Sequence, residues 1–502
     1  MAYILIGFLA LLSFYMITAL TSWYRLRRFP GPILATFSWI WLTFACQSGR
    51  SDEIYLAMRR KYKAPLIRIA PDFLFTDNAE IIRHINGARS PYVRDDWYRG
   101  FTVNPYVPSM LSATDEKTHN FLKSKTNPGY YGRDVPGLET GINSQILSLK
   151  SYIRDRYIST ATQLKFMDLG KAIEYYALDA ITMVGFGKEW GFLRADEDLN
   201  SFIETVSTVA PFIQLCTDIP FARNLFMSKV MLKLVGPKYT DKKGFGNLMR
   251  VSREAIEKRF GGEPGKGQDL LESFMRRGLS MAECEAEIPT LVIAGSDTTA
   301  GVIRSGLLHL MTSPKAYHRL QAEIDDAIGT GKVSWPISHV EARELPYLQA
   351  VIYEAIRINP PNQILMPKVV PAGGDVLLGK YRVPAGTKIG VNSMAVQRDT
   401  AVFGDDVDLF RPERFLEGPT VEKRLEMERQ VDLSWGYGRY ICSGKLVAQM
   451  ELNKVFFELL RDFDFQLVNP QAPWTRRLHI VYFVKDMWVK VTERDKVQSA
   501  ER

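Results

Sequence analysis

The sequence has few cysteines and histidines, and neither type is spaced as common metal sites require. Its four cysteines among 502 residues form no Cys-x-x-Cys pair, which argues against a structural zinc site and a disulfide framework and favours a reducing compartment. The six histidines show no His-Glu-x-x-His motif or other paired spacing. This argues against a histidine-ligated catalytic zinc, so any metal must be held another way.

Internal repeats, low-complexity segments and clustered basic stripes are also missing. The net charge is +8, but the basic residues are spread along the chain, so nucleic acid is not an expected partner. Such a charge suits anionic lipid and acidic partners. The chain is 46% hydrophobic, which is enough for a large buried core and excludes a disordered or small stapled protein.

The amino terminus is a long apolar run without charge. Residues 1–24 contain no charged side chain, and a helix over 2–20 at ~1.5 Å per residue covers roughly the ~30 Å hydrocarbon core of a bilayer. Arg25, Arg27 and Arg28 follow, so the positive-inside rule places the remainder on the cytoplasmic side. A cleaved signal peptide is the alternative, but a basic leading region and an Ala-x-Ala-like site are absent.

The rest of the chain divides into a hinge, one catalytic body and a tail. We expect a transmembrane anchor over 1–24, a basic and Pro-rich hinge over 25–34, a catalytic domain over 35–495 and a polar tail over 496–502. Helical periodicity dominates the body, most clearly between about 140 and 330. Short strands are expected within 66–75, 372–391 and 478–491. The predicted class is mainly α with a small β portion.

A long helical pattern over 280–311 carries the first candidate motif. Ser280 and Glu283 form a capping box, and Pro289 predicts a bend. Residues 294–299 read Ala-Gly-Ser-Asp-Thr-Thr, and their glycine and hydroxyl groups weaken the helix. The segment predicts a kink in the helix with a path for protons. The alternative is that the glycine serves only a packing contact and that the polar side chains are hydrogen-bonded within the helix.

A helix bounded by prolines carries the second motif. Glu354 and Arg357 stand three residues apart among apolar neighbours, which favours a partly buried structural pair over a surface pair worth only ~0.2 to 0.5 kcal/mol. Arg414, in the Arg-Pro-Glu-Arg-Phe segment 411–415, supplies another guanidinium for such a pair.

The third motif is a glycine-rich turn that ends in a cysteine. Residues 435–444 read Trp-Gly-Tyr-Gly-Arg-Tyr-Ile-Cys-Ser-Gly and precede a helical pattern over 445–460. A sulfur placed there meets free backbone N–H groups and the positive end of a helix dipole, which stabilises a thiolate. Cys442 is therefore a candidate metal ligand, and the alternative is an inert small hydrophobe.

These motifs, in this order and behind an amino-terminal anchor, resemble the haem-thiolate cytochrome P-450 family, over nearly the whole chain from the anchor to about residue 492. Residues 115–119, 373–375 and 403–405 are similar to the filamentous-fungal branch that includes pisatin demethylase. The resemblance implies the cytochrome P-450 fold with a single transmembrane helix.

The resemblance also implies roles for the motif residues. Cys442 would be the axial thiolate ligand of haem b iron. Asp297 and Thr298 would deliver protons to iron-bound oxygen, and Gly295 would leave room for dioxygen. Glu354, Arg357 and Arg414 would form a buried ion network that supports the fold.

The haem-binding pattern departs from the family at several positions. The ligand loop begins with Trp435 instead of the usual Phe, and Tyr440 replaces the arginine usual two residues before the cysteine. The family's usual Trp-x-x-x-Arg helix motif is replaced by His119-x-x-x-Lys123. The Tyr440 hydroxyl and the His119 imidazole can still donate hydrogen bonds to carboxylates. We expect the following residues around the haem: His119, Lys123, Lys368, Trp435, Arg439 and Tyr440.

The implied activity is the insertion of one atom of dioxygen into a lipophilic small molecule. The chain has no dinucleotide fingerprint, so electrons from NADPH would come through NADPH–cytochrome P-450 reductase, with cytochrome b5 as a further donor, at the endoplasmic reticulum membrane. Substrate contacts are expected from Met110, Leu291, Ala294, Ile364 and Leu365.

Several alternatives stay open at this stage. Fungal secondary metabolite biosynthesis is the preferred role, and detoxification of plant compounds is the alternative. A haem-thiolate isomerase or dehydratase tends to lose the acid and alcohol pair that Asp297 and Thr298 provide here. A non-catalytic, membrane-anchored haem-binding protein would need Cys442 but not that pair, and a single-pass adaptor protein would bind no haem.

Overall fold

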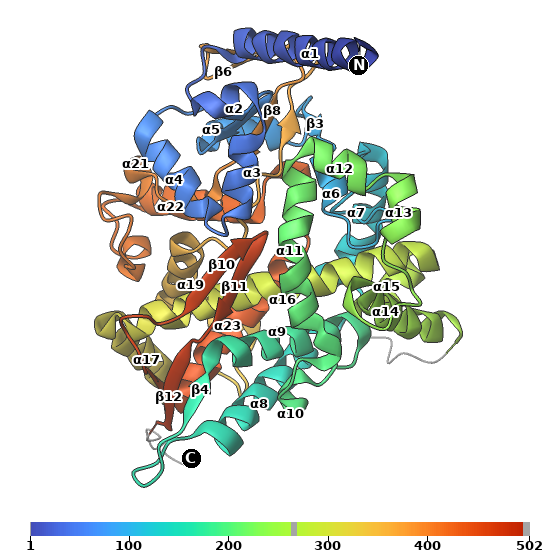
Figure 1. The fold of residues 1–502 in the computed structure, drawn as a ribbon. Helices are drawn as coiled ribbons and strands as arrows, with labels where there is room; N and C mark the ends of the chain where they lie inside the picture. Colours follow the sequence, from blue (N-terminus) through green and yellow to red (C-terminus); the bar gives the residue numbers. More distant parts are fainter. Residues whose placement is uncertain (1, 263–268, 495–502) are drawn as a thin grey trace.

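The structure is a computed structural model that describes residues 2–262 and 269–494. The predicted tail over 496–502 and residue 495 lie outside the described residues. Helices fill most of the body, and the short strands form small sheets distributed among them (Figure 1). The helices are α1 (Ala2–Leu26), α2 (Ile33–Phe37), α3 (Ile40–Gln47), α4 (Ser51–Tyr62), α5 (Ala79–Asn86), α6 (Trp97–Gly100), α7 (Glu116–Tyr130), α8 (Leu138–Tyr157), α9 (Leu169–Phe186), α10 (Phe192–Ala195), α11 (Phe202–Asp218), α12 (Pro220–Phe226), α13 (Lys229–Val235), α14 (Gly244–Phe260), α15 (Leu270–Arg276), α16 (Met281–Met311), α17 (Pro314–Gly329), α18 (His339–Arg343), α19 (Pro346–Ile358), α20 (Ser393–Val396), α21 (Thr400–Phe403), α22 (Val421–Val431) and α23 (Lys445–Asp462).

The strands form four small sheets. Their order is β1-β2-β8-β5-β3 in the largest sheet, β4-β12-β9 in the second, and two hairpins, β6-β7 and β10-β11. All pairs are antiparallel except β2 with β8. The strands are β1 (Ile67–Ala70), β2 (Phe73–Thr76), β3 (Val93–Arg94), β4 (Phe166–Asp168), β5 (Lys368–Val369), β6 (Asp375–Leu377), β7 (Tyr381–Val383), β8 (Lys388–Val391), β9 (Phe463–Leu467), β10 (Thr475–His479), β11 (Val481–Lys485) and β12 (Trp488–Glu493).

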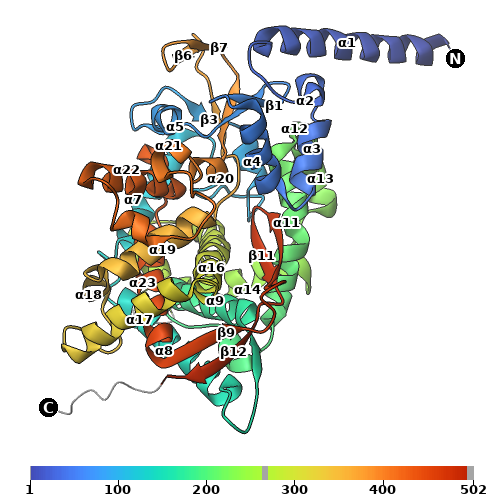
Figure 2. The same cartoon turned by 90° about the vertical axis from the view of Figure 1, so that its left-hand side faces the viewer.

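The 31-residue helix α16 is the axis of the body. It begins at the predicted capping box, in which Ser280 and Glu283 exchange hydrogen bonds, and it includes Pro289. It packs against α9, α14, α19 and α23, and Figure 2 shows it end-on in the middle of the other helices. Most of its side chains are buried in the largest hydrophobic cluster. Groups on α16 are therefore held rigidly in the centre of the protein.

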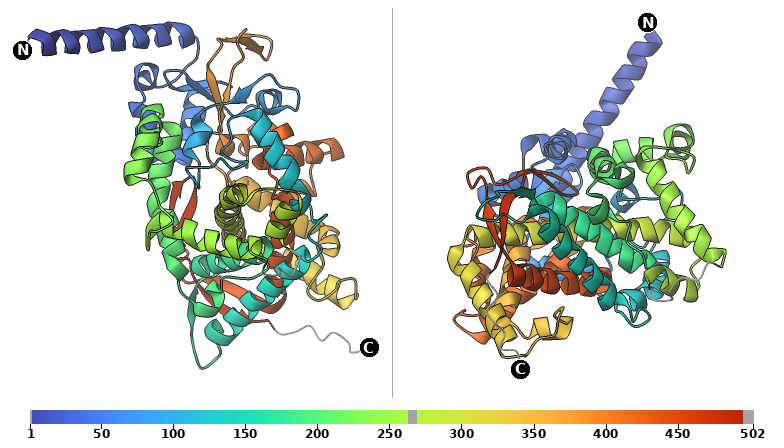
Figure 3. Two further views of the ribbon diagram at one scale, coloured as in Figure 1. Left: turned by 90° about the vertical axis from the view of Figure 1, so that its right-hand side faces the viewer. Right: turned by 90° about the horizontal axis from the view of Figure 1, so that it is seen from below.

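The apolar helix α1 projects beyond the rest of the chain, as both views in Figure 3 show. Its length and mean hydropathy of 2.2 over Tyr3–Leu26 suit a membrane span. Its last turn is fastened to the body, because the buried Arg68 guanidinium donates to the carbonyl oxygens of Ser22 at 3.0 Å and Pro71 at 2.7 Å. The Arg68 amide also donates to the Pro30 carbonyl, so the predicted hinge packs along β1.

Candidate functional site

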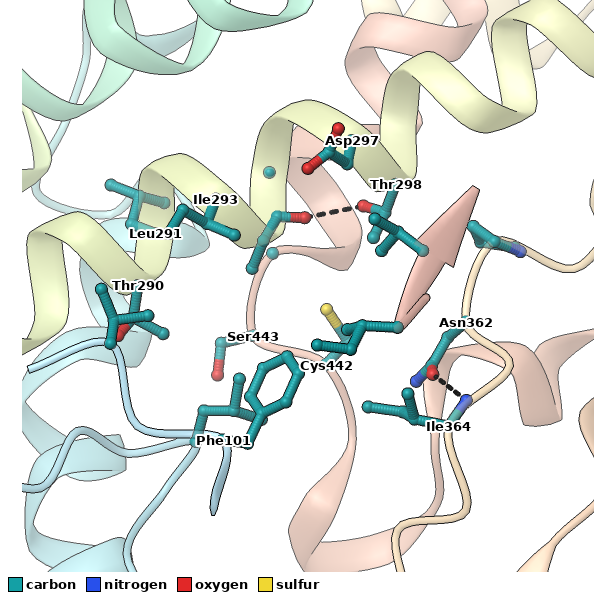
Figure 4. Close-up of a pocket in the computed structure, with 18 of the residues that line it drawn as sticks. Phe101, Thr290, Leu291, Ile293, Asp297, Thr298, Asn362, Ile364, Cys442 and Ser443 are labelled. Carbon is teal, nitrogen blue, oxygen red and sulfur yellow. Dashed lines mark hydrogen bonds between the residues drawn. The ribbon is translucent and has the colours of Figure 1, made fainter. Parts of the chain in front are cut away.

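A cavity of about 310 Å³ lies between the middle of α16 and the loop that carries Cys442. Figure 4 shows the Cys442 sulfur facing α16 across this space. Its walls are mainly apolar, as a pocket for a lipophilic ligand requires. Four of the five expected substrate contacts line it: Met110, Leu291, Ala294 and Ile364.

Leu365 is a correction, because it does not line the cavity. It lies in an extended segment whose backbone carbonyl accepts from the Val391 amide at 2.8 Å. Successive side chains of an extended chain point in opposite directions. Ile364 therefore faces the cavity, whereas Leu365 is buried in a separate cluster with Ile69 and Phe75.

The loop before α23 presents the Cys442 sulfur to the cavity. The Cys442 amide donates to the Trp435 carbonyl at 2.7 Å, which closes the loop. Gly436 and Gly438 both have positive φ, a conformation that suits glycine. Cys442 lines the cavity, and burial raises the pKa of its thiol. The backbone N–H groups of Gly444 and Lys445 oppose that shift, as expected for a loop that stabilises a thiolate.

Two buried cations lie side by side on paired strands, Arg94 on β3 and Lys368 on β5, and neither has a carboxylate partner among the described residues. Arg94 lines the cavity, whereas Lys368 does not line it itself. Lys368 is 1% exposed, and its ammonium lies 3.2 Å from the centre of the Tyr440 ring. The Arg94 guanidinium lies 4.4 Å from the Tyr98 ring and 4.8 Å from the Tyr440 ring, and its Nε has no hydrogen-bond partner among the described residues. Burial lowers the pKa of both Lys368 and Arg94.

This arrangement fits a haem. A planar apolar group with two carboxylates would fill the cavity above Cys442 and supply the anions that Lys368 and Arg94 lack. Arg94 has no distinguishing local pattern in the sequence, and only the fold brings it to Lys368. Sequence reasoning therefore missed it.

The remaining predicted haem contacts divide into two groups. His119, Lys123, Trp435 and Tyr440 line the cavity. Lys123 donates to the Arg439 and Ile441 carbonyls at 2.8 and 2.7 Å, which ties α7 to the ligand loop. Burial and the nearby Arg94 lower the pKa of His119 to about 3, so this imidazole is neutral at physiological pH.

Arg439 is a second correction. It does not line the cavity, since its guanidinium pairs with Glu116 at 2.5 Å and donates to the Ala88 carbonyl at 2.7 Å. Glu116 stands in the first turn of α7 and draws Arg439 outward. The Tyr440 hydroxyl also donates to Glu116, at 3.2 Å. Arg439 therefore fastens the ligand loop to neighbouring segments.

The acid and alcohol of α16 lie above the cavity. The Thr298 hydroxyl donates to the Ala294 carbonyl at 2.8 Å, which is the back-bonding expected of a hydroxyl in a helix. Asp297 is buried, and burial together with the neighbouring Glu174 carboxylate raises its pKa well above the usual range. Gly295 also lines the cavity, but a Cβ there would lie 2.6 Å from Ile181, so its missing side chain serves the packing of α9 on α16. Its role in making room for dioxygen stays a prediction.

The structure brings the three residues of the predicted ion network together. Arg357 donates to both oxygens of Glu354, at 2.7 and 2.8 Å, and Arg414 Nε lies 3.2 Å from each of them. All three side chains are fully buried. The remaining guanidinium N–H groups donate to backbone carbonyls such as those of Val407 and Phe403, so the buried charges are well satisfied.

Sequence reasoning missed three buried carboxyl groups near the cavity. Glu174 pairs with Arg304 between α9 and α16, Glu287 accepts from the Met110 amide, and Glu451 lines the cavity. Burial raises the pKa of Glu451 to about 8, and its Oε2 has no partner in the described part of the chain. An acidic residue in an otherwise apolar helical stripe is the one sequence signal that marks Glu287.

The site combines a cysteine that opens into the cavity, a helix above it that carries an acid and an alcohol, and buried cations without carboxylate partners among the described residues. This combination defines a haem-thiolate protein. The cytochrome P450 family model matches residues 30–484, and the chain belongs to this family. The predicted family is thereby confirmed, and with it the haem cofactor, the use of dioxygen and the need for a redox partner.

Two fungal relatives match nearly the whole chain. The chain is 42% identical over 496 residues to "Cytochrome P450 monooxygenase ABA1" of Pyricularia oryzae, covering 97% of this chain and 96% of the relative. It is 44% identical over 473 residues to "Cytochrome P450 monooxygenase aba1" of Botryotinia fuckeliana, covering 94% and 92%. The protein is therefore a haem-thiolate monooxygenase.

A solved structure shares the fold. The haem domain of cytochrome P450DA superposes with a TM-score of 0.73, covering 93% of this chain and 98% of that chain at 17% sequence identity. The predicted cytochrome P-450 fold is confirmed.

Proposed function

We propose that the cavity binds haem b with Cys442 as its axial iron ligand and that the enzyme oxidises a lipophilic small molecule. The observation that carries this proposal is the position of the Cys442 sulfur, which faces α16 across the cavity (Figure 4). When bound, haem supplies the iron at which dioxygen is activated, and a thiolate ligand favours O–O cleavage.

Lys368 and Arg94 hold the carboxylate edge of this group. Both cations are buried, and neither forms an ion pair within the described residues. His119, Lys123, Trp435 and Tyr440 line the same cavity and would contact the bound group.

Asp297 and Thr298 move protons during the reaction. Burial and the neighbouring Glu174 raise the pKa of Asp297 well above its usual range, which favours the protonated carboxyl group one residue before Thr298. Thr298 lines the cavity, and its hydroxyl would exchange the hydrogen bond to the Ala294 carbonyl for one to a molecule held there. These two residues favour a monooxygenase over an isomerase or dehydratase, and over a non-catalytic haem carrier.

Electrons come from NADPH through cytochrome P450 reductase, with cytochrome b5 as a further donor, at the cytoplasmic face of the endoplasmic reticulum. Helix α1 is the single-pass anchor. Large apolar side chains are also exposed on α2 and α3 and on α12 and α13, which lie on the side of the body next to α1 (Figure 2). They are Ile33, Ile40, Phe44, Phe221, Val230, Leu234 and Val235. This apolar side supports contact with a bilayer.

The pathway we propose is the biosynthesis of a fungal secondary metabolite, and oxidation of plant compounds is the alternative. The fungal origin of both full-length relatives supports either role. The substrate pocket is formed by Met110, Leu291, Ala294 and Ile364.

A carbon monoxide difference spectrum of the reduced protein in microsomes tests the proposed cofactor site. We expect a strongly red-shifted Soret band that disappears in Cys442→Ala. Folded wild-type protein without a haem band would overturn the assignment of Cys442.

Thr298→Ala tests the proposed chemistry in the same membranes with NADPH and reductase. Product formation should fall while peroxide release per NADPH rises. An unchanged ratio of product to NADPH would contradict the proton-transfer role of Thr298.

A further inference from the structure

Glu287 places a buried carboxyl group in the wall of the cavity. It is 2% exposed, and its Oε1 accepts a hydrogen bond from the Met110 amide at 2.5 Å. No donor of the described residues lies within hydrogen-bond distance of its Oε2, although the residue lines the cavity. A buried carboxyl group costs free energy unless its oxygens are satisfied. One oxygen is therefore available to a bound molecule.

The position of Glu287 on α16 relates it to the reacting end of the cavity. Glu287, Leu291, Ala294 and Thr298 all line the cavity. At 3.6 residues per turn these positions lie on one face of the helix. Glu287 precedes Ala294 by seven residues, which is two turns or ~10 Å along the helix axis. An elongated ligand along this face meets Glu287 at one end and Ala294, two turns away, at the other.

The neighbouring polar group does not satisfy Glu287. The Thr290 hydroxyl, which also faces the cavity, donates to the Ala286 carbonyl at 2.7 Å within its own helix. Burial raises the pKa of Glu287 to about 7, and nearby Glu283 adds to the shift. Both the neutral and the ionised carboxyl are therefore present near neutral pH, and both accept a hydrogen bond from a hydroxyl group.

We propose that Glu287 binds a hydroxyl group at one end of an elongated apolar substrate and thereby selects a carbon ~10 Å away for oxidation. This inference rests on the proposed function, because it takes the cavity as the substrate pocket. It adds a polar specificity contact to walls that are mainly apolar. The alternative is that Glu287 serves only to hold the loop around Met110 through the hydrogen bond from the Met110 amide.

Matched probes separate these two roles. Dodecan-1-ol and dodecane differ only by a terminal hydroxyl group, and each is titrated into haem-loaded, full-length protein while the Soret shift is followed. The variants are Glu287→Leu, which removes both functions, and Glu287→Gln, whose amide oxygen still accepts from Met110. Thr290→Val is the control, because it changes another polar side chain in the cavity wall without touching Glu287.

For each probe, the affinity of a variant is divided by the affinity of the wild type. The two probes partition differently between water and membrane, and this difference cancels in the ratio. We expect Glu287→Leu to weaken dodecan-1-ol binding by ~10-fold or more, the range of a hydrogen bond to a charged group, and dodecane binding by less than about 2-fold. Glu287→Gln should weaken the binding of dodecan-1-ol less than Glu287→Leu does, and it should leave the binding of dodecane unchanged. Thr290→Val should change both probes by the same factor.

Equal losses for both probes in Glu287→Leu, with Glu287→Gln like wild type, would overturn the proposal and assign Glu287 to the loop alone. The carbon monoxide spectrum of every variant is recorded in parallel. A normal band with equal losses rejects only the role of Glu287, whereas a missing band in the wild type rejects the proposed function as well.

Product analysis gives a second measurement. With reductase and NADPH, wild-type enzyme should oxidise dodecan-1-ol at a narrow group of carbons far from the hydroxyl group. Glu287→Leu should spread oxidation along the chain. The same product distribution in both proteins would contradict the selection of a carbon by Glu287.

Discussion

The buried carboxyl group of Asp297 lies beside the carboxyl group of Glu174, where α16 packs against α9. Glu174 also pairs with Arg304, two turns farther along α16, and Arg304 Nε donates to the Gly170 carbonyl at 3.0 Å. Burial, and then the charge of Glu174, raise the pKa of Asp297. The pair therefore favours a protonated carboxyl group one residue from Thr298.

The first prediction concerns the proton on Asp297. Because its folded pKa lies above its unfolded value, folding is disfavoured increasingly as pH rises from about 4 toward the folded pKa. Asp297→Asn mimics the protonated form, so the gain in Tm over wild type should be larger at pH 8 than at pH 5. Product formation should fall strongly at both values. Thermal denaturation and NADPH-coupled turnover measure these effects, and a constant Tm difference would contradict the raised pKa.

The second prediction concerns the buried ion network. Glu354→Gln removes the carboxylate shared by Arg357 and Arg414 and should cost roughly 3 to 5 kcal/mol of folding free energy. The control is Glu53→Gln, which breaks an exposed pair with Arg50 and should cost no more than about 1 kcal/mol. Urea denaturation and the yield of haem-loaded protein compare the two. Equal costs would show that the network adds nothing beyond a surface pair.

The third prediction concerns Lys368, whose buried charge has no carboxylate partner in the described chain. Lys368→Met removes that charge and should raise the Tm of haem-free protein. In the haem-loaded protein it should increase the rate of haem transfer to apomyoglobin by ~10-fold or more, because a charged hydrogen bond is lost. Lys117→Met, on the exposed side of α7, is the control. An unchanged transfer rate would place Lys368 outside the haem contacts.

The fourth prediction concerns the ligand loop. Gly438 has φ +60°, and a Cβ there would overlap the Asn86 carbonyl oxygen. Gly438→Ala should therefore strain the loop by about 1 to 3 kcal/mol and shift part of the carbon monoxide band toward shorter wavelength as thiolate ligation weakens. Gly373→Ala, where a Cβ meets nothing within 4 Å, should leave the band unchanged. Identical spectra for the two variants would argue against a constrained loop.

The local sequence pattern was sufficient to predict the helices and strands, and also those residues whose partners lie in the same segment. The capping box at Ser280 begins α16, and the apolar run forms α1. The loop around Cys442 could be predicted because helix-terminal N–H groups and left-handed glycines depend on adjacent residues. The same holds for Glu354 and Arg357, which face each other one turn apart on a single helix.

Contacts between distant segments could not be predicted in this way. Ile364 and Leu365 are adjacent apolar residues, and only their pairing with β8 decides which one reaches the cavity. Arg439 stands next to predicted haem contacts in the sequence, yet Glu116, more than 300 residues away, draws it outward.

The sequence by itself determined the class of protein, the apolar amino-terminal helix, the loop that ends in Cys442 and the acid and alcohol on one helix, because each depends on residue type and short spacing. The tertiary structure decided which buried cations have no carboxylate partner among the described residues, which carboxyl group raises the pKa of Asp297, and that Glu287 reaches the wall of the cavity. These features arise where α7, α9, α16 and the sheet edges meet, and burial there determines which charged groups find partners.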